Sequence, residues 1–309
     1  MKRLLPALAF LLTSACLSSG MPEKPLLTWD DLLSRPLPAA DRRIAYGPGA
    51  LQFAELWLPR GKAPHPVVLM IHGGCWQSDV ADRTIMNWIA DDLRGRGIAV
   101  WNVEYRGVDR PGGGYPGTYL DVAAAADLLV KDGPALGLKT DRIVAVGHSA
   151  GGHLALWLAD RSALPATSPL RGAHPAPIAA AISQGGLPDL HFSSNTVGHG
   201  CGTEGAIAMA GQPSAARPDV YADTSPIAMA PGSARQISVN ATKDVIAPPS
   251  YAAAYAAVLA AKGVTVEQHV IHDEGHVELI APGSRAWTET AALIQRAVVA
   301  RGSKRGIPR

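Results

Sequence analysis

The sequence predicts an α/β protein in which a mostly parallel central sheet is flanked by helices on both faces. Short runs rich in Val and Ile alternate along the chain with longer Ala- and Leu-rich runs. Most of the longer runs have a capping residue or a proline near the start, which is typical of helices. The chain has 309 residues, of which 47% are hydrophobic, so it can bury a large core. Regular alternation of strands and helices favours a parallel sheet.

The predicted elements follow one another from residue 51 onward. We expect strands at residues 51–58, 67–71, 98–104, 143–146, 179–183, 237–240 and 264–271. We expect helices at residues 84–96, 118–131, 151–161, 249–262 and 284–300. The α/β domain is therefore placed at residues 49–303. The Pro-rich stretch 21–48 is predicted to be a linker with one short helix at 29–34.

Residues 1–20 have the pattern of a secretory signal peptide: two basic residues, an apolar run at 4–12, and then small residues. The apolar run is much shorter than the roughly 20 residues of a membrane-spanning helix. The stretch TSAC, which ends at Cys16, resembles a bacterial lipoprotein box without its usual leucine. Lipidation of Cys16 and ordinary cleavage after Ala15 or Gly20 are both open. We expect an exported protein of the bacterial periplasm or cell envelope, in contact with a membrane only through an anchor at Cys16.

Charge and cysteine content narrow the function classes further. Only 17% of the residues are charged, the formal net charge is +2, and the basic residues are scattered, so no nucleic-acid-binding face is expected. Behind the leader, Cys75 and Cys201 are the only cysteines. They could pair in an oxidising compartment or remain two buried thiols, and the sequence leaves both possibilities open.

One segment interrupts the alternation. In residues 188–231 turn-forming residues dominate, and no long periodic element is visible. A stretch of this kind in a compact α/β domain commonly has a functional reason, for example as a lid or a pocket wall. We therefore expect a lid-like insertion at the surface rather than a part of the core.

The pattern G-H-S-A-G at residues 147–151 lies between a predicted strand and a predicted helix. This context places a serine on a sharp turn at the carboxyl edge of a sheet, where its hydroxyl is exposed as a nucleophile. Ser149 is the candidate nucleophile. The backbone N–H of Ala150 would then lie at a helix N-terminus, where unsatisfied donors and the helix dipole favour an oxyanion.

A nucleophilic serine needs a base, and the base needs an acid that orients it. For a strand–turn–helix serine the chain order is Ser, then Asp or Glu, then His, each on a loop after a later strand. Asp244 follows the predicted strand 237–240, and His276 follows the predicted strand 264–271. We therefore expect Asp244 to be the acid and His276 to be the base.

Rival residues fit less well. Asp273 and Glu274 are too near His276 in the chain to orient it, and Asp219 and Asp223 lie in the irregular insertion. His272 is the main competitor of His276, but only His276 follows a glycine that permits an exposed loop. A metal site at His269, His272 and His276 is not expected, because a strand that runs into a loop points the first two side chains to opposite sides.

The segment HGGCW, residues 72–76, follows the predicted strand 67–71. Its glycines let the backbone approach a substrate oxygen and offer N–H donors to an oxyanion. We expect the donors to come from among Gly74, Cys75 and Ala150. Three residues are expected to support the loop: His72 by ordering it, Gly73 by allowing close approach, and Trp76 by packing beneath it. A nucleophilic Cys75 thiol is not favoured, since no pattern assigns it a base.

Taken together, these motifs resemble the α/β-hydrolase superfamily. The resemblance is to the branch of hormone-sensitive-lipase-like esterases, kynurenine formamidase-like proteins and bacterial feruloyl or acetyl esterase-like (BD-FAE-like) domains. It rests on HGGCW, NVEYRGVDRPGGGYPGTYLDV, GHSAGGHLA, DTSPI, KDVIAP and EGHVEL, and it covers residues 51–299. It implies an α/β-hydrolase fold and a Ser-His-Asp triad, but it does not specify the substrate.

Two departures from the resembled pattern concern the pocket. Relatives usually read D-x-x-V-P after the acid, whereas here Asp244 is followed by VIAP. The insertion carries Cys201 and many glycines where relatives often have a short helical cap. Both differences alter the walls of the site without removing a proposed triad residue.

The expected reaction is hydrolysis of a small-molecule ester through an acyl-enzyme, and it implies no cofactor. The resemblance also suggests a second substrate class, the aryl-formamides, as in N-formylkynurenine-like amides. A hydrolase fold can also persist as a catalytically silent binding protein, because fold alone does not establish activity.

Overall fold

A computed structural model describes residues 24–197 and 200–299, so the expected leader and Cys16 lie outside the described residues. The domain is built on one eight-stranded sheet with the order β1-β2-β4-β3-β5-β6-β7-β8. The strands are β1 Arg42–Ala45, β2 Phe53–Trp57, β3 His65–Ile71, β4 Ala99–Val103, β5 Leu138–His148, β6 Ile178–Gln184, β7 Arg235–Ala241 and β8 Val266–Ile271.

Strand direction brings the loops of the candidate site to one edge of the sheet. β2 pairs antiparallel with β1 and β4, whereas all pairs from β4 to β8 are parallel. The chain places β4 on one side of β3 and then crosses over to place β5 on its other side, so the order of strand addition reverses at β3. Ligands of open α/β sheets bind at such switch points, outside the carboxyl ends of the strands. The mostly parallel sheet confirms the predicted fold class.

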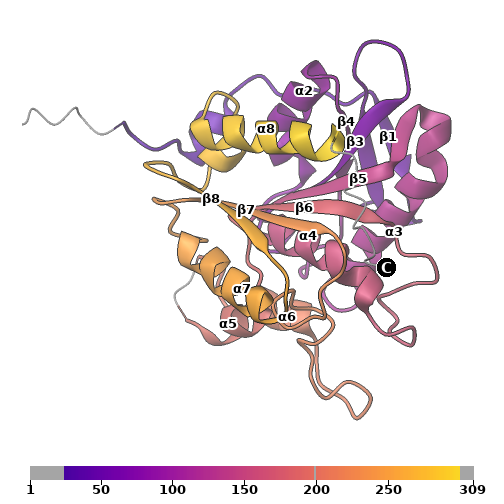
Figure 1. Cartoon of the computed structure of the whole chain (residues 1–309), viewed down its shortest axis with the longest axis vertical. Helices are drawn as coiled ribbons and strands as arrows, with labels where there is room; N and C mark the ends of the chain where they lie inside the picture. Colours follow the sequence, from indigo (N-terminus) through magenta and orange to yellow (C-terminus); the bar gives the residue numbers. More distant parts are fainter. Residues whose placement is uncertain (1–23, 198–199, 300–309) are drawn as a thin grey trace, which may run out of the picture.

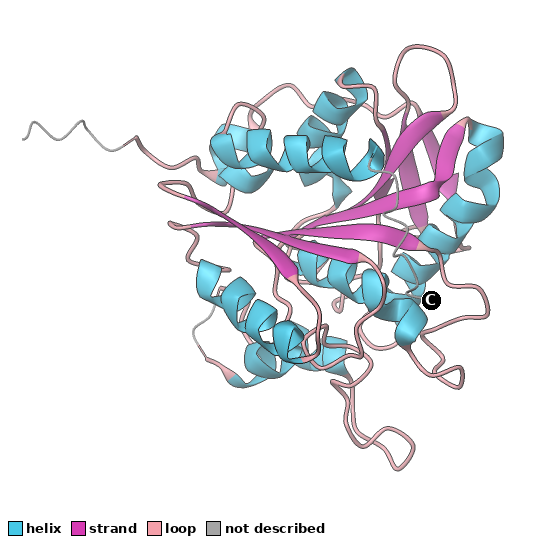
Figure 2. Ribbon diagram, in the orientation of Figure 1, coloured by secondary structure: helices cyan, strands magenta, loops and turns pink. Residues whose placement is uncertain are grey.

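Helices cover both faces of the sheet, with α2 and α8 on one face and α3, α4 and α7 on the other (Figures 1 and 2). The helices are α1 Trp29–Leu33, α2 Asn87–Gly95, α3 Gly117–Asp132, α4 Ala150–Asp160, α5 Leu190–Asn195, α6 Glu204–Ala210, α7 Pro249–Ala261 and α8 Arg285–Val299. Four 3-10 turns are η1 Arg83–Met86, η2 Gly133–Leu136, η3 Arg161–Ala163 and η4 Glu278–Ile280.

The central strands are apolar at consecutive positions because each face of the sheet has its own core. In β3, Leu69 and Ile71 belong to the core under α3, α4 and α7, while Val68 and Met70 belong to the core under α2 and α8. Successive side chains of a strand point to opposite faces, so a strand buried on both sides needs no polar alternation. This explains why the sequence shows continuous apolar runs.

Two regions differ from the predictions. Residues 42–45 fall in the predicted linker, but they form β1, which pairs with β2 at the edge of the sheet. The insertion at 188–231 was expected to lie at the surface, but its short helices α5 and α6 place Leu190, Ala206 and Met209 in the core. That expectation is therefore wrong for these two helices. Their six and seven residues are too short to show a helical period in the sequence.

Candidate active site

Ser149 lies on the turn between β5 and α4, with φ 55° and ψ −122°. A non-glycine residue in such a region costs about 1–3 kcal/mol and persists mainly at functional sites. The turn is tight enough to require glycine on both sides. A Cβ on Gly147 would lie 1.9 Å from the Gly151 carbonyl oxygen, and a Cβ on Gly151 would lie 2.1 Å from the Ile71 carbonyl oxygen. The local sequence thus forces the serine outward at the sheet edge.

Ser149 opens onto a pocket of about 360 Å³ that also contains His276. The backbone N–H of Ser149 donates to the Gln184 carbonyl at 2.8 Å, which ties the turn to the end of β6. The pocket is lined by Trp29, Leu33, Gly74, Cys75, Val80, Ala81, Ile85, His148, Ser149, Gly200, Ile246 and His276. Residues from five other parts of the chain therefore meet around Ser149.

His276 and Asp244 form a buried pair on the loops after β8 and β7. The His276 Nδ1–H donates to Asp244 Oδ2 at 2.7 Å. The other carboxylate oxygen, Oδ1, accepts from the backbone N–H groups of Ile246 and Ala247 at 2.8 and 2.9 Å. Burial alone would raise the pKa of Asp244, but the bonds from His276 and the two backbone groups outweigh it and lower the pKa. An ionised Asp244 holds the proton on Nδ1, so the Nε2 of a neutral His276 can act as a base.

Two of the rival acids and His269 are engaged elsewhere, and the rivals His272 and Asp273 are exposed. Glu274 accepts from the backbone N–H groups of Arg285 and Ala286 at the start of α8. His269, in β8, lies 2.9 Å from Glu267 of the same strand and 3.3 Å from Glu289 of α8. Asp223 is paired with an arginine of the insertion. Within residues 24–197 and 200–299, no three His, Cys, Asp or Glu side chains gather in a way that could hold a metal ion.

The loop after β3 places Gly74 and Cys75 on the pocket wall beside Ser149. Gly74, Cys75 and Trp76 have positive φ angles of 105°, 52° and 60°, so the backbone coils tightly there. Within the described part of the chain, the N–H groups of Gly74 and Cys75 donate to no protein acceptor. Ala150 is the first residue of α4, so its N–H has no partner within the helix. These three N–H groups are available to a substrate oxygen.

His72 supports this loop from below. Its Nδ1 lies 2.7 Å from the Gly73 carbonyl oxygen, and its Nε2 lies 3.1 Å from Glu104 Oε1. Both partners are acceptors, so the ring makes both bonds at once only when it is protonated. Burial alone would raise the pKa of Glu104, but the nearby His72 outweighs it and lowers the pKa. The ring of His72 also stacks on Tyr105 at 4.2 Å between centroids.

Trp76 is fully buried beneath the same loop, and its indole N–H donates to His153 Nδ1 on α4 at 3.1 Å. This bond joins the loop after β3 to the helix that begins at the serine. The wall of the site and the nucleophile turn are therefore held to one another.

Cys75 and Cys201 form a disulfide, with 5.3 Å between their Cα atoms. Of the two states that the sequence left open, the structure has the bridge. It joins the loop after β3 to the insertion, and it removes the Cys75 thiol from consideration as a nucleophile.

Comparison with known proteins decides the family. A family model described as BD-FAE matches residues 55–259, which is more than half of the chain. The chain belongs to the BD-FAE family of α/β-hydrolase esterases. No protein of curated function matches the chain significantly in sequence. The family confirms the resemblance inferred from the motifs.

Several solved structures are similar to this BD-FAE chain, and three of them are esterases below 25% identity, which show the fold alone. A truncated carbohydrate esterase from gut microbiota is 16% identical, with a TM-score of 0.65 over 84% of this chain and 95% of that one. A bacterial heroin esterase is 24% identical, with a TM-score of 0.60 over 80% and 78%. The butyrate-bound thermophilic esterase of the Planctomycetes species Thermogutta terrifontis is 20% identical, with a TM-score of 0.64 over 84% and 93%.

The sequence did not point to His148, which contacts the base directly. Its Nε2–H donates to the His276 carbonyl at 3.1 Å, and the two rings lie 4.3 Å apart. Burial, and then the proximity of His276, lowers the pKa of His148 well below its usual value, so the ring is neutral. Its position between Gly147 and Ser149 is the one signal that could have identified it. A residue next to the nucleophile necessarily lies at the same edge of the sheet.

The sequence also did not identify Trp29 and Leu33, which precede the BD-FAE region and yet line the pocket. The ring of Trp29 lies edge-on to His276 at 6.4 Å and to His148 at 6.2 Å between centroids. No local pattern predicts this contact, because the residues are more than 100 positions apart.

Proposed function

We propose that this BD-FAE chain is an exported serine hydrolase that cleaves a carboxylic ester through an acyl-enzyme. The observation that carries the proposal is the single pocket shared by Ser149, on its strained turn, and His276, oriented by an ionised Asp244. A serine, a base and an acid in this relation are the components of nucleophilic acyl transfer.

In the first half-reaction, His276 Nε2 takes the proton of the Ser149 hydroxyl while Oγ forms a bond to the ester carbonyl carbon. The N–H groups of Gly74, Cys75 and Ala150 hold the negative oxygen of the tetrahedral intermediate. The C–O bond to the leaving alcohol then breaks, and His276 returns its proton to that alcohol. Asp244 stabilises the positive His276 ring between the two transfers.

In the second half-reaction, His276 takes a proton from water, and the resulting hydroxide attacks the acyl carbon. The bond to Ser149 Oγ then breaks, Oγ receives the proton from His276, and the carboxylic acid leaves. The two half-reactions together consume one water and restore the enzyme, so they require no cofactor.

Ester substrates are favoured over other carbonyl compounds because the similar structures are esterases by name, one of them with butyrate bound. Hydrolysis of an aryl-formamide is the second candidate, and the HGGCW loop is the observation that favours it. The same serine mechanism would serve both substrate classes, with an amine as the leaving group in the second.

Export is proposed from the leader pattern of residues 1–20 and is supported by the Cys75–Cys201 bridge, since disulfides persist in oxidising compartments. Expression of the full chain with and without Cys16→Ser in a Gram-negative host tests both parts. A periplasmic or membrane location supports export, a cytoplasmic location of the uncleaved chain contradicts it, and loss of membrane association in the variant identifies lipidation.

The catalytic proposal is tested with the chain lacking its leader and with the Ser149→Ala variant side by side. Labelling by a fluorophosphonate probe is measured together with turnover of p-nitrophenyl esters, a feruloyl ester, an acetylated sugar and N-formylkynurenine. The proposal expects labelling and ester turnover in the parent and neither in the variant. Turnover of N-formylkynurenine alone would select the second candidate. A parent that neither labels nor turns over any substrate would overturn the enzyme proposal in favour of a binding protein.

A further inference from the structure

Helix α1 forms one wall of the pocket that contains Ser149, although it lies outside the region that defines the BD-FAE family. Trp29 and Leu33, four residues apart, are on the same side of this helix. Trp29 is 36% exposed and Leu33 is 50% exposed, which is high for large apolar side chains that line a pocket. Large apolar side chains rarely cluster on an exposed protein surface unless they form a binding site.

The wall is anchored to the protein body. Leu32, between the two lining residues, is fully buried in the core under α2 and α8. The start of the helix is fixed by a capping box in which Thr28 and Asp31 bond to each other's backbone. Beyond its end, the Arg35 side chain donates to the Pro282 carbonyl at 3.0 Å. Trp29 and Leu33 are therefore held over the pocket by contacts that involve neither of them.

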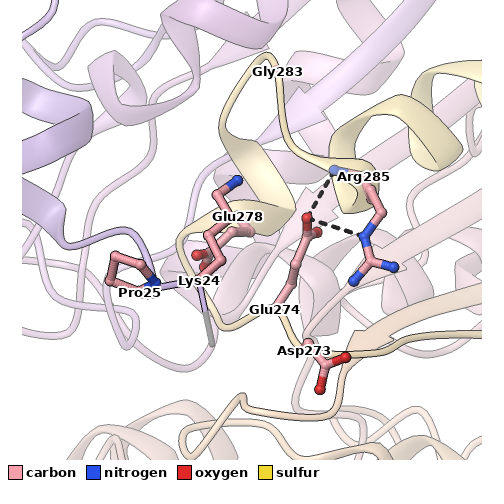
Figure 3. Close-up of a pocket in the computed structure, with 7 residues that line it drawn as sticks. All are labelled: Lys24, Pro25, Asp273, Glu274, Glu278, Gly283 and Arg285. Carbon is pink, nitrogen blue, oxygen red and sulfur yellow. Dashed lines mark hydrogen bonds and ion pairs between the residues drawn. The ribbon is translucent and has the colours of Figure 1, made fainter. Parts of the chain in front are cut away.

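Glu278 links this wall to the loop that carries His276. One of its carboxylate oxygens accepts from the Leu27 N–H at 2.5 Å, and the other accepts from the Gly275 N–H at 3.0 Å. Figure 3 shows Lys24 and Pro25 of the same N-terminal segment beside Glu278, while Glu274 points toward Arg285. One carboxylate thus sets the distance between α1 and the base.

Apart from the residues of the proposed site, the side chains of the pocket lining that the structure describes are apolar and uncharged. The apolar side chains that line the pocket together with Trp29 and Leu33 include Val80, Ala81, Ile85 and Ile246. Among the described residues of the lining, the polar side chains are those of His148, Ser149 and His276, and each of them already has a part in the proposed site. The described lining offers a sugar ring few partners for its hydroxyl groups beyond the groups of the proposed site, and each hydroxyl desolvated without a partner costs free energy. At about 360 Å³, the pocket is near the small end of ligand sites.

We propose that α1 determines the substrate class of the enzyme: esters whose group bound against Trp29 and Leu33 is small and apolar, such as a short aliphatic chain or a single aromatic ring. This inference rests on the proposed esterase function and adds to it the chemistry and size of the substrate. Trp29 and Leu33 set the length limit, because they line the pocket together with the apolar side chains of the domain and are held there by the anchored segment around α1.

The test compares two substrate series in the parent and in three variants. One series lengthens the acyl chain of p-nitrophenyl esters from acetate through butyrate to octanoate, and the other lengthens the alcohol of acetate esters from methyl through butyl to octyl. Leu33→Trp fills the pocket, and Trp29→Ala enlarges it. Leu37→Ala is the matched control, because Leu37 is an apolar residue of the same segment with 57% exposure that does not line the pocket.

In at least one series, the parent is expected to prefer the four-carbon ester over the eight-carbon ester. Leu33→Trp should lower the ratio of kcat/KM for the four-carbon ester to that for the shortest ester by roughly tenfold or more. Trp29→Ala should raise the ratio of the eight-carbon to the four-carbon ester by a similar factor, while Leu37→Ala leaves both ratios within about twofold of the parent. Ratios are used because loss of the Trp29 contact with His276 could lower the rate on all substrates.

Turnover of the shortest ester and fluorophosphonate labelling report on the catalytic groups separately from the wall. If all variants label and turn over the shortest ester but both series keep the parent's ratios, the specificity inference is overturned and the esterase function stands. A parent that prefers the acetylated sugar or the eight-carbon esters overturns the inference in the same way. If the parent shows neither labelling nor turnover, the proposed function itself fails. Should Trp29→Ala not fold, Leu33→Trp at the half-exposed position decides the result.

Discussion

The disulfide between Cys75 and Cys201 joins the loop after β3 to the insertion across a sequence separation of 126 residues. Cys75 lies on the pocket wall with a positive φ of 52°, a conformation that a non-glycine residue adopts only where its surroundings enforce it. The bridge therefore helps to hold the backbone whose N–H groups are proposed to bind the oxyanion.

We expect the loss of this bridge to lower both stability and rate. Closing a loop of this length restricts the unfolded chain, so Cys201→Ser should lower the free energy of unfolding by about 2–5 kcal/mol. The value of kcat should fall more than KM rises, because the donors matter most in the transition state. Urea unfolding and steady-state kinetics, each with and without dithiothreitol, measure both effects. The reductant should lower the stability and the rate of the parent but not of the variant. If the unfolding curve of the parent is the same with and without the reductant, the prediction is contradicted.

Asp244→Asn should lower kcat by about 10⁴-fold with little change in KM. An asparagine at this position cannot carry the negative charge that stabilises the His276 ring, and its amide N–H₂ favours the wrong tautomer of the histidine. The exposed rival acid Asp273 supplies the control, since Asp273→Asn should leave the rate unchanged. Steady-state kinetics on one p-nitrophenyl ester measure both variants, and similar losses in the two would show that Asp244 has no special role.

Glu104→Gln should weaken the support of the oxyanion loop. The substitution removes the charged partner of His72, and a hydrogen bond to a charged group contributes about 1.5–3 kcal/mol. We expect a lower free energy of unfolding and a kcat lower by on the order of tenfold, less than the loss of a whole oxyanion donor. Glu267→Gln is the comparison, because Glu267 bonds to Arg235 at the other end of the sheet, away from the loop. An unchanged kcat in Glu104→Gln would mean that the loop keeps its shape without this pair.

Asp160 should make the stability depend on pH. It is fully buried at the end of α4, where burial raises its pKa to about 6. Between about pH 4 and 6 the folded state then binds more protons at this site than the unfolded state, so the free energy of unfolding falls as the pH rises. A shift of about two units corresponds to about 3 kcal/mol.

Asp160→Asn removes this titration, so between pH 4 and 7 the parent should lose about 2 kcal/mol relative to the variant, because the unfolded carboxyl is already partly ionised at pH 4. Urea unfolding at pH 4, 5, 6 and 7 measures the difference. The exposed Asp141→Asn variant should follow the parent throughout. A constant difference between the parent and Asp160→Asn over this range would refute the titration of Asp160.

The sequence by itself predicted the features that depend on neighbouring residues. The G-H-S-A-G turn needs two glycines and a strand–helix junction, all within a few positions, and the structure has that turn at Ser149. The loops that carry Asp244 and His276 were placed in the same way, because each follows an apolar strand and parallel strands end at a common edge. The two cores, one on each face of the sheet, likewise follow from the continuous apolar runs of the central strands.

Only the tertiary structure decided the features that depend on distant residues. β1 has four residues, too few for a periodic pattern, and it is stabilised by pairing with β2, which no local pattern describes. The short helix expected at 29–34 is present as α1, but its position at the pocket was not predicted. The contact of Trp29 with His276 and the Cys75–Cys201 bridge join residues far apart in the chain. Local patterns encode local conformation, whereas the walls of the pocket arise where separate segments pack together. The chemistry proposed for this protein could therefore be predicted from its sequence, but the shape of the site that receives the substrate could not.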